Sequence, residues 1–148
     1  MGLDQNLYRR AKNGDPIDTE TRTFGTNEEY EAENAFIGWR KMNAIHGWMV
    51  KHVMDGIDEN EGESYWISYS NLLDFYDQLV KARLTRDATI FPPTKGFFFG
   101  GTEVDEYYWE ELLWTIEQLQ DTITEMKEAV KTGELVNYEY SFWYESSW

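Results

Sequence analysis

The sequence predicts an α+β fold in which three main helices pack on a small antiparallel sheet formed from the N- and C-terminal strands. Both ends of the 148-residue chain alternate apolar and polar residues, as half-buried strands do. The long middle part instead carries apolar residues at helical spacing in three segments. Hydrophobic residues make up 41% of the chain, which is enough to bury one substantial core. We therefore expect residues 1–148 to form a single domain.

The two terminal strands are expected to pair with each other. The first covers Leu3 to Arg9, and the last covers Leu135 to Tyr144 with aromatic residues along one face. After the first strand, residues 11–28 are rich in Gly, Asp, Thr and Asn, which predicts a variable loop region with a short strand around Thr21 to Phe24. An aromatic strand near the edge of a sheet also leaves room for a homo-oligomer.

The first helix is expected over Glu28 to Met54. At 100° per residue, Trp39, Asn43 and His46 fall on one stripe of this helix, and apolar residues cover most of the remaining circumference. Residues 55–64 are acidic and are expected to form a solvated turn. The pattern therefore predicts a central, largely buried helix.

Two further helices are expected in the second half of the chain. Each has a serine or threonine start signal, and the last is followed by a glycine stop signal. The predicted elements are a short strand at residues 65–67, a second helix from Ser68 or Ser70 to about Leu84, and a third helix from Thr102 to about Lys131 before Gly133. The third helix keeps heptad-like apolar spacing from Trp109 to Val130, so we expect it to pack on the core.

The net charge of −15 is concentrated in the second part of the chain. Residues 1–54 hold seven Lys/Arg against eight Asp/Glu, a balance of −1, whereas residues 55–148 hold six against twenty, a balance of −14. Such a surface repels duplex DNA and anionic membranes, so we expect no direct DNA binding and no membrane partner. It suits solubility or docking on a basic protein surface.

The residue types also limit the chemistry. The chain has no Cys and only two His, so neither a metal site nor a cofactor is predicted. No Ser-His-Asp or Cys-His order with an elbow motif is present, so no catalytic residue is assigned. No apolar run approaches ~18 residues and the N-terminus lacks a signal-peptide apolar region, which predicts a cytosolic protein.

The segment from Phe91 to Trp109 is the most unusual part of the sequence. Two prolines precede Lys95 and Gly96, and three successive phenylalanines then lead to a glycine pair. The glycine pair allows a ligand to approach the backbone closely, and Lys95 beside free backbone amides can cradle an anion. Because neighbouring side chains of an extended segment point to opposite sides, at least one phenylalanine is expected to face a second surface or a pocket.

Four stretches carry a resemblance to a known family. They are MGLD and LYRR within residues 1–10, WRKMNAIHGW at 39–48, PTKGFFFGGTEVDEYYWEEL at 93–112, and YESSW at 144–148. In this order, over nearly the whole chain, they resemble a family of small uncharacterised bacteriophage and prophage proteins. The chain departs from the family pattern at Gln5, Asn6, Met42, Gly101 and Val104. The resemblance implies a phage-encoded accessory protein that works in the host cytoplasm against host defence or on host metabolism.

The leading hypothesis is a site that binds and sequesters a small anionic, nucleotide-like ligand, such as a signal of host immunity, without catalysis. Aromatic rings would stack on bases, while cations and backbone amides would meet phosphate. The candidate rings are Trp39, Phe98 and Trp109, and the other candidate positions are Arg40, Asn43, His46, Lys95, Gly96, Gly100, Gly101, Thr102 and Asp105.

Other interpretations fit the same residues. The Trp39, Asn43 and His46 side chains can instead form a buried network that is satisfied within the protein. Carboxylates at the start of the third helix suit its dipole and need no ligand. A different function is an acidic inhibitor that binds a basic host protein through residues 103–128. A third is an enzyme in which His46 and Asp105 form an acid–base pair.

Overall fold

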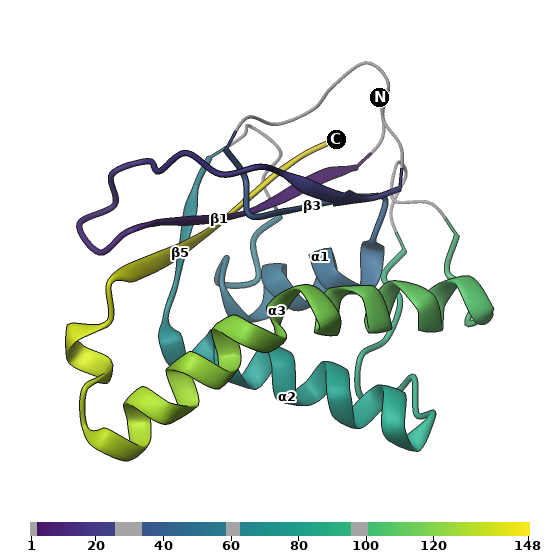
Figure 1. Ribbon diagram of the computed structural model, residues 1–148. Helices are drawn as coiled ribbons and strands as arrows, with labels where there is room; N and C mark the ends of the chain where they lie inside the picture. The colour runs from purple at the N-terminus through teal and green to yellow at the C-terminus, as the bar shows by residue number, and fades with distance from the viewer. Residues whose placement is uncertain (1–2, 26–33, 59–62, 96–100) are drawn as a thin grey trace.

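A computed structural model describes residues 3–25, 34–58, 63–95 and 101–148. Its described part has the predicted α+β class, with a mixed five-stranded sheet in the order β2-β3-β1-β5-β4. The strands are β1 (Asp4–Ala11), β2 (Arg22–Phe24), β3 (Ile37–Arg40), β4 (Tyr65–Ile67) and β5 (Tyr140–Ser147). The main helices are α1 (Asn43–His52), α2 (Tyr69–Thr85) and α3 (Glu106–Thr132), and all three lie on one side of the sheet (Figure 1).

The predicted pairing of the two terminal strands is confirmed. Strands β1 and β5 run antiparallel in the middle of the sheet, in a register that joins Asp4 to Ser147 and Ala11 to Tyr140. The inward-facing side chains of these strands, among them Leu7 and its cross-strand neighbour Tyr144, are fully buried beneath the helices. The sheet is mixed and not purely antiparallel, because β2 runs parallel to β3.

The predicted first helix is wrong over residues 34–42, and its first residues, 28–33, lie outside the described part of the chain. Residues Ile37–Arg40 form strand β3, which lies between β1 and β2, and α1 begins only at Asn43. A strand with neighbours on both sides and helices above it is buried without alternation, so its sequence resembles a segment of a buried helix. Lys41 makes the turn between the two elements with a φ of 59°. Trp39 therefore lies on a strand and not on the same helical stripe as Asn43.

The ends of the other helices are close to the predicted ones. Ser68 caps α2 by accepting a hydrogen bond from the amide of Asn71, and Gly133 ends α3 with a φ of 74°, as expected. The start of α3 lies later than predicted, because Asp105 and not Thr102 is the N-cap. The C-terminal prediction also needs correction, since residues 135–137 form a short 3₁₀ helix (η1) before β5 begins.

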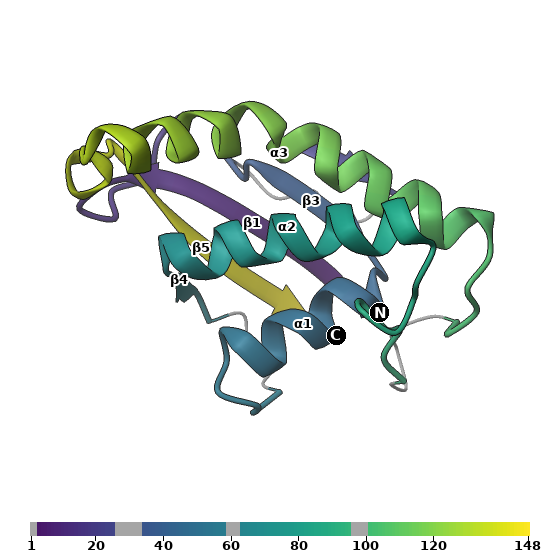
Figure 2. The same ribbon diagram turned by 90° about the horizontal axis from the view of Figure 1, so that it is seen from below.

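Helices α2 and α3 lie side by side across the sheet, as the view from below shows (Figure 2). The loop at residues 91–95 passes over α1, and Gly47 makes this close passage possible. A Cβ atom at Gly47 would overlap with the hydroxyl of Thr94. The apolar stripe of α3 is confirmed as a core face for most of its length, although Val130 near the end of the helix is exposed.

Candidate ligand-binding site

A pocket of about 530 Å³ opens where the β3–α1 turn meets the beginning of α3. The turn contributes Arg40, Lys41 and Asn43 to its lining. A second part of the lining comes from the residues before α3 and its first turns, with Gly101, Glu103, Asp105, Tyr107, Tyr108 and Glu111. A pocket of this volume is in the usual range for small-molecule sites. It brings together four of the predicted site residues, namely Arg40, Asn43, Gly101 and Asp105.

The turn side of the pocket is cationic. Arg40 is partly buried, and its Nη1 atom donates to Oδ1 of Asp4 across the sheet at 3.0 Å. Lys41 is exposed at the rim. Because Asp4 already balances much of the charge of Arg40, Lys41 is the cation of this turn that has more of its charge available for a ligand.

Asn43 holds the pocket together and is nearly fully buried. Its Oδ1 atom accepts a hydrogen bond from the amide of Thr94 at 3.0 Å, and its Nδ2 atom donates to the carbonyl of Gly101 at 2.6 Å. These bonds tie α1 to two segments that are distant from it in sequence. The side chain therefore positions the lining, which differs from the predicted role of donating directly to a ligand.

The residues at the start of α3 line the pocket with polar side chains that hydrogen bonds hold in place. Asp105 accepts a hydrogen bond from the amide of Tyr108 at 3.0 Å, which makes it the helix cap. The Tyr108 hydroxyl donates to the carbonyl of Phe91, and burial raises the pKa of this tyrosine to about 12. Both groups thus order the backbone around the opening.

Glu111 is the residue of the pocket that the sequence interpretation missed. It was counted among the carboxylates that suit the helix dipole, yet it is only 8% exposed and lines the pocket. Burial, followed by the nearby negative charge of Asp105, raises its pKa to about 8. Among the described residues, none donates a hydrogen bond to its carboxyl group. A signal was present in the sequence, because position 111 falls on the same helix stripe as the buried residues Leu112 and Thr115.

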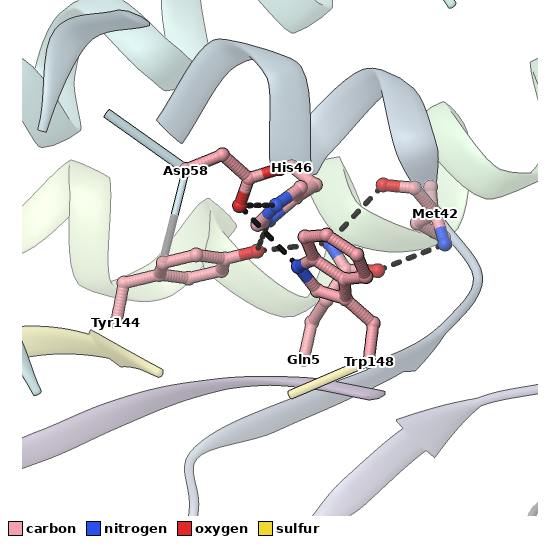
Figure 3. A network of polar contacts seen from close by, with 6 residues as sticks. All are labelled: Gln5, Met42, His46, Asp58, Tyr144 and Trp148. Carbon is pink, nitrogen blue, oxygen red and sulfur yellow. Dashed lines mark hydrogen bonds and ion pairs between the residues drawn. The ribbon is translucent and has the colours of Figure 1, made fainter. Parts of the chain in front are cut away.

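His46 is not part of this pocket. Its ring is fully buried in a network that Figure 3 shows, where Nδ1 lies 2.8 Å from the Tyr144 hydroxyl and Nε2 lies 2.8 Å from Oδ1 of Asp58. Gln5 extends the network by donating to the Tyr144 hydroxyl at 3.1 Å. Trp148 donates to Asp58 at 3.3 Å, so the last ring docks beside His46 and not over the pocket.

Burial lowers the pKa of His46, and the hydrogen bond and charge of Asp58 only partly oppose this effect. The imidazole is therefore neutral near pH 7, and its contact with Asp58 is a hydrogen bond of a neutral ring. Since Asp58 accepts from Nε2–H, Nδ1 accepts from the Tyr144 hydroxyl. The predicted acid–base pair of His46 with Asp105 is not formed, because both ring nitrogens bind elsewhere.

Trp39 and Trp109, the two predicted stacking rings that the structure describes, do not line the pocket. Trp39 is buried in the core, where its Nε1 atom donates to the Thr115 hydroxyl at 2.9 Å. Trp109 packs edge-on against Tyr108 with 4.8 Å between ring centroids, and the Arg86 guanidinium lies 5.0 Å from its ring. Lys95 and Thr102 are exposed and are not among the lining residues. Gly96, Phe98 and Gly100 lie outside the described residues.

Comparisons with known proteins give no family for the chain. No family model matches it, and neither a curated protein nor a solved structure is similar to it. In the described ranges, no group of three or more His, Asp or Glu side chains is arranged to hold a metal ion. No described helix is both long enough and apolar enough to cross a membrane.

Proposed function

We propose that the protein binds a small, nucleotide-like ligand in this pocket and holds it without turning it over. The observation that carries the proposal is a pocket of about 530 Å³ whose lining contains both cations, from the β3–α1 turn, and carboxyl groups, from the residues before α3 and its first turns. A nucleotide carries groups that both kinds of side chain can bind. Its negative phosphate suits the cations, and the N–H groups of its base suit the carboxyl groups. The pocket therefore fits both ends of one molecule.

The charges favour a ligand with a small negative charge. The lining contains two cations, Arg40 and Lys41, and three acidic residues, Glu103, Asp105 and Glu111. Near pH 7, Glu111 is mostly neutral because its pKa is about 8, so the formal charges of the lining nearly cancel. A single phosphate charge close to Lys41 is tolerated in such a pocket, whereas a triphosphate would meet the carboxylates.

Sequestration fits the wider context of the chain. Its motifs resemble those of bacteriophage and prophage proteins, and many accessory proteins of phages act against host defence. A protein that holds a signalling nucleotide needs a pocket but no acid–base machinery, and the ring nitrogens of His46 are engaged by Tyr144 and Asp58 away from the pocket. We therefore place the protein among phage counter-defence proteins that remove a nucleotide-like signal by binding it.

The first experiment is to denature the protein purified from cells and to search for a released nucleotide-like molecule by mass spectrometry. Thermal shifts with a panel of cyclic nucleotides and NAD derivatives then identify the best ligand. For that ligand, Lys41→Met should weaken binding about tenfold, because one charge-assisted contact to phosphate is lost. Lys131→Met removes the same charge near the far end of α3, at least ~30 Å away along the helix, and should leave binding unchanged. If the two variants weaken binding equally, Lys41 is not part of the binding site.

A second candidate function is docking on a basic partner protein through α3. Glu106, Glu110, Glu117, Asp121 and Glu128 are all exposed, and their spacing places them within about 60° of one another around the helix. This acidic stripe extends along most of a helix about 40 Å long. It predicts a partner whose binding weakens steeply between 50 and 300 mM salt and is lost in a Glu117→Gln/Asp121→Asn variant, while nucleotide binding is unchanged.

A further inference from the structure

Tyr107 presents an exposed aromatic ring at the pocket. Among the described lining residues, two carry an aromatic ring, Tyr107 and Tyr108. Tyr108 is only 4% exposed, and its hydroxyl donates to the carbonyl of Phe91, whereas Tyr107 is 52% exposed. Tyr107 is therefore the lining ring with a large surface that a ligand can reach.

Aromatic packing holds the Tyr107 ring in place. Phe24, the last residue of β2, packs against it with 5.5 Å between ring centroids and an angle of 37° between the ring planes. Phe24 also packs against Trp114 of α3, with 5.4 Å between centroids. A ring that is already packed against a neighbour loses less conformational freedom when a ligand covers its accessible surface. The Tyr107 ring is thus preorganised for stacking.

The backbone after Phe24 places this ring pair next to a cation of the pocket. Gly25 lines the pocket with a φ of 86°, and a Cβ atom at this position would lie only 2.9 Å from the Cβ atom of Arg40. The close approach of these two backbones joins the aromatic pair to the β3–α1 turn. A ligand that covers Tyr107 is therefore also near the cations of the turn.

The carboxyl groups of the lining lie on the other flank of the ring, along α3. Glu111 follows Tyr107 by four residues, which makes the two side chains neighbours on one face of the helix. Burial, followed by the negative charges of Glu111, Glu110 and Asp105, raises the pKa of the Tyr107 hydroxyl. The ring is therefore bordered by groups that accept hydrogen bonds from N–H donors.

A flat ring beside carboxyl groups suits the base of a nucleotide better than its phosphate. The carboxylates of Glu103 and Asp105 repel a phosphate, which would instead lie near Lys41. Stacking of a base on an aromatic side chain strengthens binding by roughly 5- to 150-fold, and it tolerates different bases because every base has a π-face.

We infer that Tyr107 is the ring on which the base of the nucleotide-like ligand stacks. This inference rests on the proposed function, since it names a contact of the same ligand in the same pocket. It gives Tyr107 the role that the sequence suggested for Trp39 and Trp109, which are not among the lining residues. The ligand class that follows is a phosphate joined to a flat heteroaromatic base, with little preference among bases.

The test is calorimetric titration of the full chain with 3′,5′-cyclic AMP and 3′,5′-cyclic GMP, which share sugar and phosphate and differ in the base. If neither binds, the nucleotide of the panel that binds best takes their place. Tyr107→Phe keeps the ring, so its affinity for each nucleotide should stay within about twofold of the wild type. Tyr107→Leu keeps an apolar side chain but has no ring, and it should weaken binding of both nucleotides by about tenfold or more.

Trp66→Leu is the matched control. Trp66 is 59% exposed and lies on β4, at the edge of the sheet opposite to β2. This variant removes an exposed ring far from the pocket and should bind as the wild type does. NMR spectra of the bound nucleotide add a direct readout, because the ring current of a stacked aromatic side chain moves the base protons upfield. The shift should occur with the wild type and Tyr107→Phe and be reduced with Tyr107→Leu.

The outcomes distinguish the inference from the function on which it rests. If Tyr107→Leu binds as tightly as the wild type, or if Tyr107→Phe loses as much affinity as Tyr107→Leu, the ring of Tyr107 does not stack on the base, although the pocket still binds nucleotides. If Trp66→Leu weakens binding as much as Tyr107→Leu, the loss is not specific to the pocket and the inference is also wrong. If no nucleotide of the panel binds to the wild type, the proposed function itself fails.

Discussion

Two of the buried ionisable residues that the structure describes, His46 and Glu111, differ in the hydrogen-bond partners that surround them. His46 is surrounded by partners, with Tyr144 on one ring nitrogen and Asp58 on the other. Glu111 is almost as deeply buried, yet it faces a pocket and has no described donor. A buried group with a complete set of partners stabilises a single conformation, whereas one without partners reduces stability and leaves hydrogen-bonding capacity for a ligand. The comparison separates the structural site from the candidate functional site.

The largest effect is expected when the His46 network is broken. His46→Ala leaves a cavity and removes one hydrogen-bond partner each from Tyr144 and Asp58, so it should lower the free energy of unfolding by about 3–5 kcal/mol. Urea denaturation followed by tryptophan fluorescence measures the change. If the free energy of unfolding falls by less than about 1 kcal/mol, the His46 network does not stabilise the fold, and it no longer differs from Glu111 in this respect.

Glu111 should have the opposite effect on stability, and its size should depend on pH. The pKa of Glu111 is raised from 4.5 to about 8, so its contribution to stability is complete below pH 4.5 and is lost as the pH rises to about 8. Glu111→Gln removes this loss and should therefore stabilise the protein by roughly 2–4 kcal/mol at pH 8.5 relative to the wild type, with a much smaller difference at pH 4.5. Denaturation at both pH values checks the prediction, and a difference that is independent of pH would contradict it.

The titration of His46 should have a smaller effect on the free energy of unfolding, and in the opposite direction, because this contribution is lost as the pH falls. Its pKa lies below 6.5 in the folded protein, so its contribution to stability is complete above pH 6.5 and is lost as the pH falls through the lower folded value. The wild type should lose on the order of 1 kcal/mol between pH 6.5 and 5.5 from this group. His46→Gln should lose less over the same interval. An equal loss in both proteins would assign the acid sensitivity to another group.

The smallest predicted effect concerns the turn that bears the cations. Lys41 has a φ of 59°, a conformation that glycine adopts without strain. Lys41→Gly should therefore raise the free energy of unfolding by about 0.5–1 kcal/mol while it weakens nucleotide binding. The two changes have opposite directions, which is the behaviour expected of a functional position. If stability falls and binding is unchanged, Lys41 belongs to the structural part of the molecule.

Much of the fold follows from local patterns in the sequence. The alternating residues of the two ends predict β1 and β5 and their pairing, and serine and glycine signals predict the start of α2 and the end of α3. Strand β3 was not predictable in this way. A buried strand lacks alternation, so the run from Phe36 to Trp39 has the same apolar character as parts of the helix that follows it.

The candidate site was predictable only in part. Four of the predicted positions line one pocket, and they come from the motif around Asn43 and the glycine segment before α3, which are both unusual in sequence. His46 and Trp39 were placed with them through an assumed helix that the fold replaces by a strand and a turn. Glu111 was missed because a carboxylate in the first turns of a helix is ordinary, although its place on the helix stripe of Leu112 and Thr115 was a signal of burial.

The most direct test of the account is an NMR titration of the ¹⁵N-labelled protein with cyclic AMP, in which the amide shifts are mapped on the structure. The account predicts that the largest shifts occur at Lys41, Gly101 and Glu111, with small changes at His46 and Tyr144. The largest shifts around His46 and Tyr144, with none at Lys41 and Glu111, would show that the ligand binds at the network and that the pocket is not the functional site.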